Sequence, residues 1–266
     1  MRHLQFEVKD NIAFIKLNRP ESLNAFSLEM IDYWIESLKI IRDNEDIHVG
    51  ILTGTGKAFC AGGDVKSMKA GKGFMSQSAE EVDLHSTPSN TKDSLWKYIQ
   101  KIPLLMEEID KPMIASINGA AIGAGLDMSL MCDYRICSNK AKLGEGYINA
   151  GIVPGDGGGY FLPRIVGIDK ALELLWTGKV ITAEEAKEIG LVSQVVEHED
   201  LHKVTINFAE QLANAPQLAL RMTKRLVYQN LTMSLKQSLD MASSFMGITV
   251  HHQEHKEKIK KMDNKD

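Results

Sequence analysis

One acidic residue, Asp127, lies alone in an apolar stretch that runs from Gly119 to Met131. The stretch begins with small residues and continues as an apolar helix, whose first N–H groups lack partners inside the helix and lie at the positive end of its dipole. Such N–H groups suit a developing oxyanion. Because an unpaired buried carboxylate is costly, we interpret Asp127 as a functional acid or base in preference to a carboxylate that local amides satisfy.

Two further loops contain several glycines, lead into a predicted helix and carry an acidic residue. In Ala58–Val65, the backbone of Gly63 is placed to contact a ligand, while Asp64 is interpreted as the N-cap of the next helix. In Gly151–Gly159, Asp156 either caps the following helix or takes part in catalysis, and the sequence leaves both readings open.

Alternating strands and helices must position these residues. Ser27, with Met30 three residues later, predicts the start of a helix that runs to Ile41. Apolar runs and alternation predict strands at Leu4–Val8, Ile12–Leu17, His48–Thr53, Met113–Ile117 and Tyr134–Cys137. Later helices are predicted at Ala171–Thr177, Ala183–Ile189, Leu201–Asn214, Gln217–Gln229 and Met233–Thr249. This order predicts an α/β class followed by a helical packing or oligomer module.

Two polar segments show no clear period. Met68–Asn90 is rich in Gly, Ser, Lys and Met, and it predicts a mobile surface segment beside the site. His251–Asp266 is Lys-rich and predicts a loosely ordered tail. The tail contains an HxxEH pattern at His251–His255, but no third ligand is evident, so we expect no metal site.

The composition excludes several classes of protein. The 266 residues include 31 basic and 35 acidic side chains, and this net charge of -4 disfavours nucleic acid or an anionic membrane as the main partner. We read no signal peptide and no membrane span. With three cysteines, a reducing compartment is expected, and we predict a cytoplasmic protein. Neither a P-loop nor a GxGxxG turn supports a nucleotide cofactor.

In its motifs the chain resembles the crotonase family, also called the enoyl-CoA hydratase/isomerase superfamily. Each motif alone is weak, but together and in this order they are highly specific. The resemblance covers nearly the whole chain to about Val250, after which the sequence departs from the family pattern. The matching segments are Leu17–Pro20, Leu23–Ala25, Ala58–Val65, Lys111–Ala115, Asn118–Asp133, Gly151–Gly158, Leu174–Gly178 and Ala183–Val192.

The resemblance implies a fold, a substrate class and an assembly. The implied fold is α/β: a crotonase-like spiral of ββα repeats over residues 1–200, which carries the acyl-CoA site, and a C-terminal helical trimerisation region over residues 201–266. The implied substrate is an acyl-CoA thioester, with no cofactor besides the CoA of the substrate. The implied assembly is a homotrimer or a dimer of trimers.

Individual positions carry over from the family. Its two backbone amides that hold the thioester carbonyl, the oxyanion hole, match Gly63 and Ala124. The positions that match its CoA-binding region are Ala25, Ala61, Asp64, Val65 and Lys66.

The two catalytic glutamates of the family's hydratases are not reproduced. The first matches Asp127 and the second matches Tyr147, a phenol whose ordinary pKa of about 10 makes it a poor activator of water. Two nearby acids could compensate, and we rank Asp156 above Glu145, which would share a face with Tyr147 in an extended segment. The candidate catalytic residues are therefore Asp127, Asp156, Glu145 and Tyr147.

Hydration of a 2-enoyl-CoA through a thioester enolate is the expected reaction. Enoyl-CoA or dienoyl-CoA double-bond isomerisation is the alternative, because it needs only groups that move a proton along the chain. Further alternatives are acyl-CoA hydrolysis or dehalogenation on the same scaffold, and a catalytically weak acyl-CoA or RNA binder. The acidic charge disfavours RNA. The acyl group is not readable, and Met68–Asn90 is expected to select it.

Overall fold

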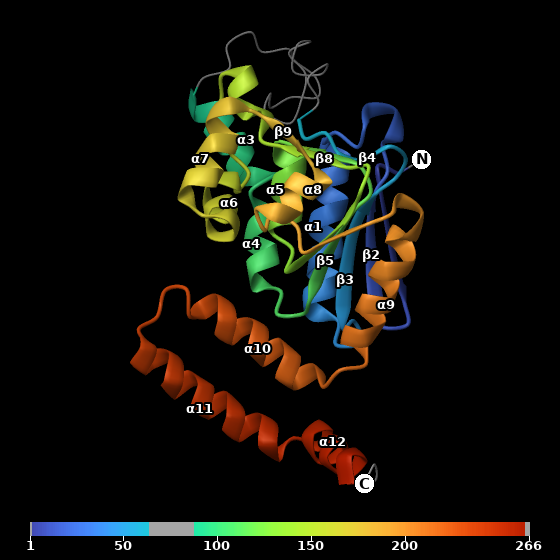
Figure 1. The fold of residues 1–266 in the computed structure, drawn as a ribbon, viewed down its shortest axis with the longest axis vertical. Helices are drawn as coiled ribbons and strands as arrows, with labels where there is room; N and C mark the ends of the chain where they lie inside the picture. The colour runs from blue at the N-terminus through green and yellow to red at the C-terminus, as the bar shows by residue number, and fades with distance from the viewer. Residues whose placement is uncertain (1, 64–87, 264–266) are drawn as a thin grey trace.

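The computed structural model describes residues 2–63 and 88–263. These residues form two β-sheets with helices on both sides and a helical arm at the C-terminal end (Figure 1). None of the described helices is long and apolar enough to cross a membrane. Most of the predicted segment Met68–Asn90 lies outside the described residues, and its end, from Pro88, belongs to helix α3 (Pro88–Lys97).

The larger sheet has six strands, and the predicted strands of the sequence all belong to it. β1 pairs with β2 in antiparallel fashion, and every later neighbour is parallel. In spatial order the strands are β1 (Leu4–Lys9), β2 (Ile12–Leu17), β3 (Val49–Gly54), β5 (Met113–Ile117), β7 (Tyr134–Ser138) and β10 (Gln194–Val196).

The smaller sheet has four short strands, and β4, β6 and β8 in it are parallel while the last strand is antiparallel to β8. In spatial order they are β4 (Ala58–Cys60), β6 (Ala120–Ile122), β8 (Lys142–Gly144) and β9 (Val180–Thr182). The chain visits the two sheets alternately, as β3 then β4, β5 then β6, and β7 then β8. This alternation, with helices between the turns, is the predicted spiral of ββα repeats.

Helices cover both faces of the larger sheet. Along β5, Met113 and Ala115 pack in the main core with α1 (Leu28–Asp43), whereas Ile114 packs on the other face with α9 (Leu201–Ala213). The remaining helices of the body are α4 (Lys101–Glu108), α5 (Ala124–Leu130), α6 (Gly158–Val166), α7 (Ile168–Thr177) and α8 (Ala183–Glu188), with 3₁₀ turns η1 (Pro20–Ser22), η2 (Gly146–Ala150) and η3 (His198–Asp200).

The predicted start of α1 is confirmed. Ser27 is the N-cap, and its hydroxyl oxygen accepts a hydrogen bond from the backbone N of Met30 at 3.2 Å. The helix then buries Trp34, Leu38 and other apolar side chains at helical spacing. A local capping signal and a helical apolar pattern therefore agree in this segment.

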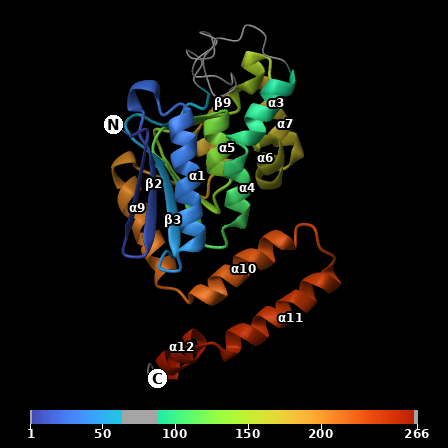
Figure 2. The ribbon, with the colours of Figure 1, turned by 180° about the vertical axis from the view of Figure 1, so that it is seen from behind.

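The C-terminal helices α10 (Gln217–Gln229), α11 (Leu235–His251) and α12 (Gln253–Asp263) stand away from the body, as Figures 1 and 2 both show. Lys224 anchors α10 to the body through an ion pair of 2.8 Å with Asp133. α11 buries none of its residues and leaves Leu235 and Met246 exposed. By contrast α9, the first helix of the predicted trimerisation region, packs on the larger sheet, so the division at residue 200 stays a prediction.

The prediction of a loosely ordered tail at His251–Asp266 was wrong for most of that segment, which forms the end of α11 and all of α12. The carboxylate of Glu254 accepts hydrogen bonds from the backbone N–H groups of Gln217 and Leu218, at 2.9 and 3.1 Å. These are unpaired donors at the start of α10. Capping of one helix by another therefore orders a segment whose composition is polar.

Candidate active site

The candidate residues follow directly after the parallel strands of the smaller sheet. The loop Ala61–Gly63 follows β4, Gly123 and α5 follow β6, and Glu145 follows β8. Because β4, β6 and β8 are parallel neighbours, their carboxyl ends meet at one edge of the sheet. Sites in parallel sheets form at such an edge. The topology therefore brings together segments that lie far apart in the sequence.

The loop after β4 and the start of α5 are in direct backbone contact. A Cβ atom at Gly62 would lie 3.2 Å from the N of Ala124, and one at Gly125 would lie 2.1 Å from the carbonyl oxygen of Cys60. Gly123 has a φ of 53°, a left-handed conformation that turns the end of β6 into α5. Only glycine at these positions allows the two backbones to approach so closely.

The two predicted oxyanion-hole residues lie on these adjacent segments. Among the described residues, none accepts a hydrogen bond from the N–H of Gly63 or from that of Ala124, the first residue of α5. The N–H of Ala124 also lies at the positive end of the helix. The pairing of these two amides as one anion-binding site stays a prediction.

Of the predicted CoA-binding residues, Ala25 and Ala61 lie on paired segments. The N of Ala61 donates to the carbonyl of Leu23 at 3.0 Å, and the N of Phe26 donates to the carbonyl of Gly62 at 2.9 Å. Ala25 is buried and Ala61 is half-buried. Asp64, Val65 and Lys66, together with the expected N-cap at Asp64, lie outside the described residues.

Asn24 holds this pair of segments, and the sequence analysis did not assign it that role. Its side chain is fully buried, and its Nδ2 donates to the carbonyl oxygens of Thr55, Ala58 and Phe59 at 2.9, 2.8 and 3.2 Å. Its φ of 57° is left-handed, which asparagine tolerates better than most residues. The available signal in the sequence was an asparagine in the segment that follows the predicted strand Ile12–Leu17.

Tyr147 joins the two candidate aspartates. Its hydroxyl oxygen lies 2.5 Å from Oδ2 of Asp127 and 3.0 Å from Oδ2 of Asp156. All three side chains are buried. One hydroxyl carries one proton, so it donates to one aspartate at a time, and the other contact needs a proton on that aspartate. The three groups therefore form a single hydrogen-bonded unit that can hold and pass a proton.

These contacts exclude the two purely structural readings, a capping role for Asp156 and local amides as the partners of Asp127. The N-cap of α6 is Gly157 and no side chain caps that helix, so Asp156 is not a capping residue. Asp127 is not satisfied by amides of its own helix, because its carboxylate faces Tyr147 and the start of α6. Whether either aspartate acts in catalysis stays a prediction.

Glu145 lies beside this unit, in a geometry that differs from the expected one. The segment Gly146–Ala150 forms a 3₁₀ turn, so the extended conformation in which Glu145 and Tyr147 would share one face is not formed. Glu145 is nevertheless fully buried, and its carboxyl group interacts with Asp127. The end of β8, rather than an extended segment, delivers it to the site.

The four side chains bind protons with different affinities. Burial raises the pKa of Asp156 to about 6. Burial is also the main cause that raises the pKa of Asp127 to about 7, although the hydrogen bond from Tyr147 opposes it. Burial and the neighbouring Asp127 raise the pKa of Glu145 to about 10, and burial raises that of Tyr147 above its usual range. At neutral pH, Asp156 is thus the most ionised member of the cluster.

Comparison with known proteins assigns the family. The family model described as enoyl-CoA hydratase/isomerase matches residues 7–265. The chain belongs to the enoyl-CoA hydratase/isomerase family. A crotonyl-CoA hydratase of Syntrophomonas wolfei is 31% identical over 252 residues, which are 94% of this chain and 91% of the relative. A trans-2-decenoyl-acyl-carrier-protein isomerase of Streptococcus mutans is 26% identical over 254 residues, which are 92% of each chain.

Solved structures agree with the family assignment. The crystal structure of an enoyl-CoA hydratase from Bacillus anthracis superposes with a TM-score of 0.88 at 32% identity, and the match covers 99% of this chain and 96% of that one. The chain therefore has the crotonase fold. The family match also continues to residue 265, beyond Val250, where the resemblance was expected to end.

Gly158 also lies at the candidate site, although it was not among the residues predicted from the sequence. It is the first residue of α6, and a Cβ atom there would lie 2.4 Å from Oδ1 of Asp127. The start of α6 therefore lies directly against this carboxylate, and its N–H lowers the pKa of Asp127 against the effect of burial. The three consecutive glycines at 157–159 were visible in the sequence, but the side chain that they contact was not.

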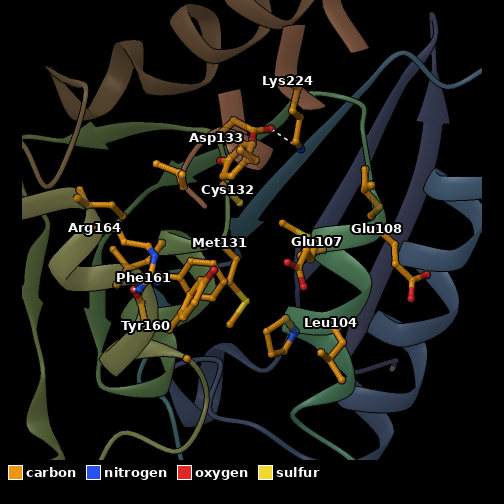
Figure 3. A pocket seen from close by; sticks show the side chains of 18 of the residues that line it. Leu104, Glu107, Glu108, Met131, Cys132, Asp133, Tyr160, Phe161, Arg164 and Lys224 are labelled. Carbon is orange, nitrogen blue, oxygen red and sulfur yellow. Dashed lines mark hydrogen bonds and ion pairs between the residues drawn. The ribbon is translucent and has the colours of Figure 1, made fainter. Parts of the chain in front are cut away.

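A cavity of about 800 Å³ lies on another side of the molecule, between α4, α6 and α10 (Figure 3). Its walls include Leu104, Phe161 and Lys224, and none of the four clustered side chains of the candidate site lines it. Gly157, next to Asp156, forms part of its wall. Within the described residues, no group of His, Cys, Asp and Glu side chains is arranged to hold a metal ion.

Proposed function

We propose that this enzyme adds water to a 2-enoyl thioester of coenzyme A. The observation that carries the proposal is the contact of one hydroxyl, that of Tyr147, with two buried aspartates, Asp127 and Asp156, whose pKa values burial raises toward neutrality. Pairs of acids whose environments separate their pKa values are typical of acid–base catalysis. The likeness to a crotonyl-CoA hydratase supports the same reaction.

The amides of Gly63 and Ala124 would hold the thioester carbonyl. Charge develops on this oxygen when the thioester becomes an enolate, and a donor in such a hole typically contributes about 3–4 kcal/mol to the transition state. Ala25, Ala61, Asp64, Val65 and Lys66 would bind the CoA part of the substrate. The enolate is common to hydration and to isomerisation, so this part of the proposal does not depend on the final product.

The aspartates would divide the proton transfers. Asp156 takes a proton from water while the water oxygen bonds to C3, and Asp127 gives its proton to C2. In addition, Oδ1 of Asp156 accepts no hydrogen bond from the described residues, so it has lone pairs left for the water. Afterwards the proton on Asp156 passes to the Tyr147 oxygen while the Tyr147 proton passes to Asp127. This transfer restores the starting state without a further reactant.

The test is turnover by the purified protein of crotonyl-CoA, followed as loss of the conjugated enoyl thioester absorbance. Asp127→Asn and Asp156→Asn should each lower kcat by about 100-fold or more. Asp32→Asn, at an exposed site on α1, is the matched control and should leave kcat unchanged. No hydration together with an unchanged Asp127→Asn variant would contradict the proposal.

Double-bond isomerisation is a second candidate, and one observation favours it. Tyr147 stands where the resemblance places the second glutamate, and its hydroxyl links two acids to each other. A linked pair can take a proton from one carbon and return it to another. Formation of the conjugated thioester from 3-enoyl-CoA, without a hydroxyacyl product, would identify this reaction. Relatives include both hydratases and an isomerase.

The proposal includes an assembly and a location. The family resemblance suggests a homotrimer or a dimer of trimers, and the exposed apolar residues of α11 support an assembly of some kind, because an apolar helix face in a protein is usually covered. We further propose that the enzyme works in the cytoplasm and needs no cofactor besides the CoA of its substrate. Light scattering of the purified protein measures the assembly, and a monomer at micromolar concentration would contradict that part.

A further inference from the structure

Glu145 is a buried acid with no donor from the rest of the described protein. Its side chain is fully buried, and neither carboxyl oxygen accepts a hydrogen bond from a described residue. The titratable groups that act on it come from three elements: Asp127 on α5, Asp156 before α6, and Tyr147 on η2. No basic side chain of the described residues contributes to this interaction.

An ionised Glu145 would be costly in this position. Two carboxylates are both acceptors, so they cannot form a hydrogen bond, and their charges repel in a medium of low polarity. A neutral carboxylic acid has one O–H donor and forms a short hydrogen bond with a carboxylate beside it. Protonation of Glu145 thus gives a hydrogen-bond partner to one oxygen of Glu145 and one oxygen of Asp127 that otherwise lack one.

We infer that Glu145 is a positioning residue that remains a neutral carboxylic acid and donates a hydrogen bond to the carboxylate of Asp127. The four side chains then form one row in the order Glu145, Asp127, Tyr147 and Asp156. Glu145 orients Asp127 from the side of β8, while Tyr147 holds it from the side of η2. The raised pKa of Glu145, about 10, agrees with the neutral form.

A neutral Glu145 affects Asp127, the acid of the proposed reaction, and in this respect the inference rests on the proposed function. A donor to the Asp127 carboxylate stabilises its ionised form and so lowers the pKa of Asp127. Asp127 therefore gives up its proton more readily than burial alone would allow. Glu145 itself keeps its proton and does not touch the substrate.

Infrared difference spectroscopy of the protein without substrate tests the neutral acid directly. The C=O stretch of a protonated carboxylic acid should be present at neutral pH in the wild type, and one such band should be absent in Glu145→Gln. If Glu145→Gln instead loses the bands of an ionised carboxylate and keeps every C=O band of a protonated acid, the inference is overturned. Because no turnover is measured, this result does not depend on which reaction the enzyme performs.

The pH profile of kcat/KM distinguishes positioning from a purely structural role. Glu145→Gln keeps a neutral donor and should leave the alkaline limb in place. Glu145→Met has similar size but no donor, and should move that limb upward by about one pH unit, because Asp127 then holds its proton more tightly. A downward shift in both variants would show that Glu145 is ionised, and an unchanged limb in both would show a structural role only. Either result would overturn the inference.

Circular dichroism of both variants controls for folding. If Glu145→Met does not fold, the infrared comparison of the wild type with Glu145→Gln decides the question alone. Loss of activity in Glu145→Gln as large as in Asp127→Asn would also overturn the inference, because a proton that must leave Glu145 is incompatible with a positioning role.

Discussion

The hydroxyl oxygen of Tyr147 lies 2.5 Å from a carboxylate oxygen of Asp127, although 20 residues separate them in the sequence. Tyr147 belongs to a 3₁₀ turn after β8, and Asp127 belongs to the helix after β6. Parallel pairing of β6 and β8 places these two elements side by side. The contact is the shorter of the two links in the hydrogen-bonded unit of Asp127, Tyr147 and Asp156.

Tyr147→Phe should remove the link between the two aspartates while preserving the ring. We expect kcat to fall by about 100-fold, because the proton return from Asp156 to Asp127 is lost. The pKa of Asp127 should rise, since the hydrogen bond from Tyr147 lowers it in the wild type. Steady-state kinetics across pH measure both effects. Tyr160→Phe, at an exposed site on α6, is the control, and an equal loss in both variants would contradict the assigned role.

The rate should depend on pH as a narrow bell. As the proposed base, Asp156 would act only when ionised, so kcat/KM should rise with pH through about 6. As the proposed acid, Asp127 would act only when protonated, so kcat/KM should fall above about pH 7. The groups interact, and the apparent values belong to the cluster as a whole. A profile flat between about pH 5 and 8 would contradict the division of roles.

Gly158→Ala should damage the site, whereas the neighbouring Gly159→Ala should not. A Cβ at Gly158 would lie 2.4 Å from Oδ1 of Asp127, so the carboxylate or the start of α6 must move. Misplacement of a catalytic group by about 1 Å can lower kcat by about 100-fold. At Gly159 the nearest atom would be 3.7 Å away, an ordinary contact. Equal kcat values for the two variants would show that the placement of Asp127 is not critical.

Glu145→Gln should stabilise the protein increasingly as pH rises. The carboxyl of Glu145 titrates at about 4.5 in the unfolded chain and at about 10 in the folded one, so the folded wild type binds the extra proton between these values. Wild-type stability therefore falls with rising pH, and the fall is complete above the folded pKa. The slope relative to Glu145→Gln should be about 1 kcal/mol per pH unit.

Urea unfolding of both proteins at about pH 5 and about pH 8 measures this difference. The stabilising effect of Glu145→Gln should be small at the lower pH and larger at the higher one. An effect independent of pH would mean that Glu145 has the same pKa in both states. Glu36→Gln, at a site on α1 whose side chain is not fully buried, is a suitable control.

Local features were predictable from the sequence because short-range physics determines them. Ser27 starts α1 through a bond to an amide three residues away, and the strands Ile12–Leu17 and Met113–Ile117 follow from apolar runs. The helix Gln217–Gln229 was predicted with its observed bounds for the same reason. That Asp127 has a partner also followed from the sequence, since a lone acid in an apolar helix is costly to bury unpaired.

Only the tertiary structure decided which partners these residues have. Tyr147 is hydrogen-bonded to Asp127 and Asp156, and Gly158 lies against Asp127. Glu254 caps α10 in the same way, because packing brings separate elements together. No local pattern encodes such distances, since they depend on how parallel strands end at one edge and how the helices after them are oriented. The sequence alone therefore determined the elements and the family resemblance, and the assembled fold decided how protons are shared in the site.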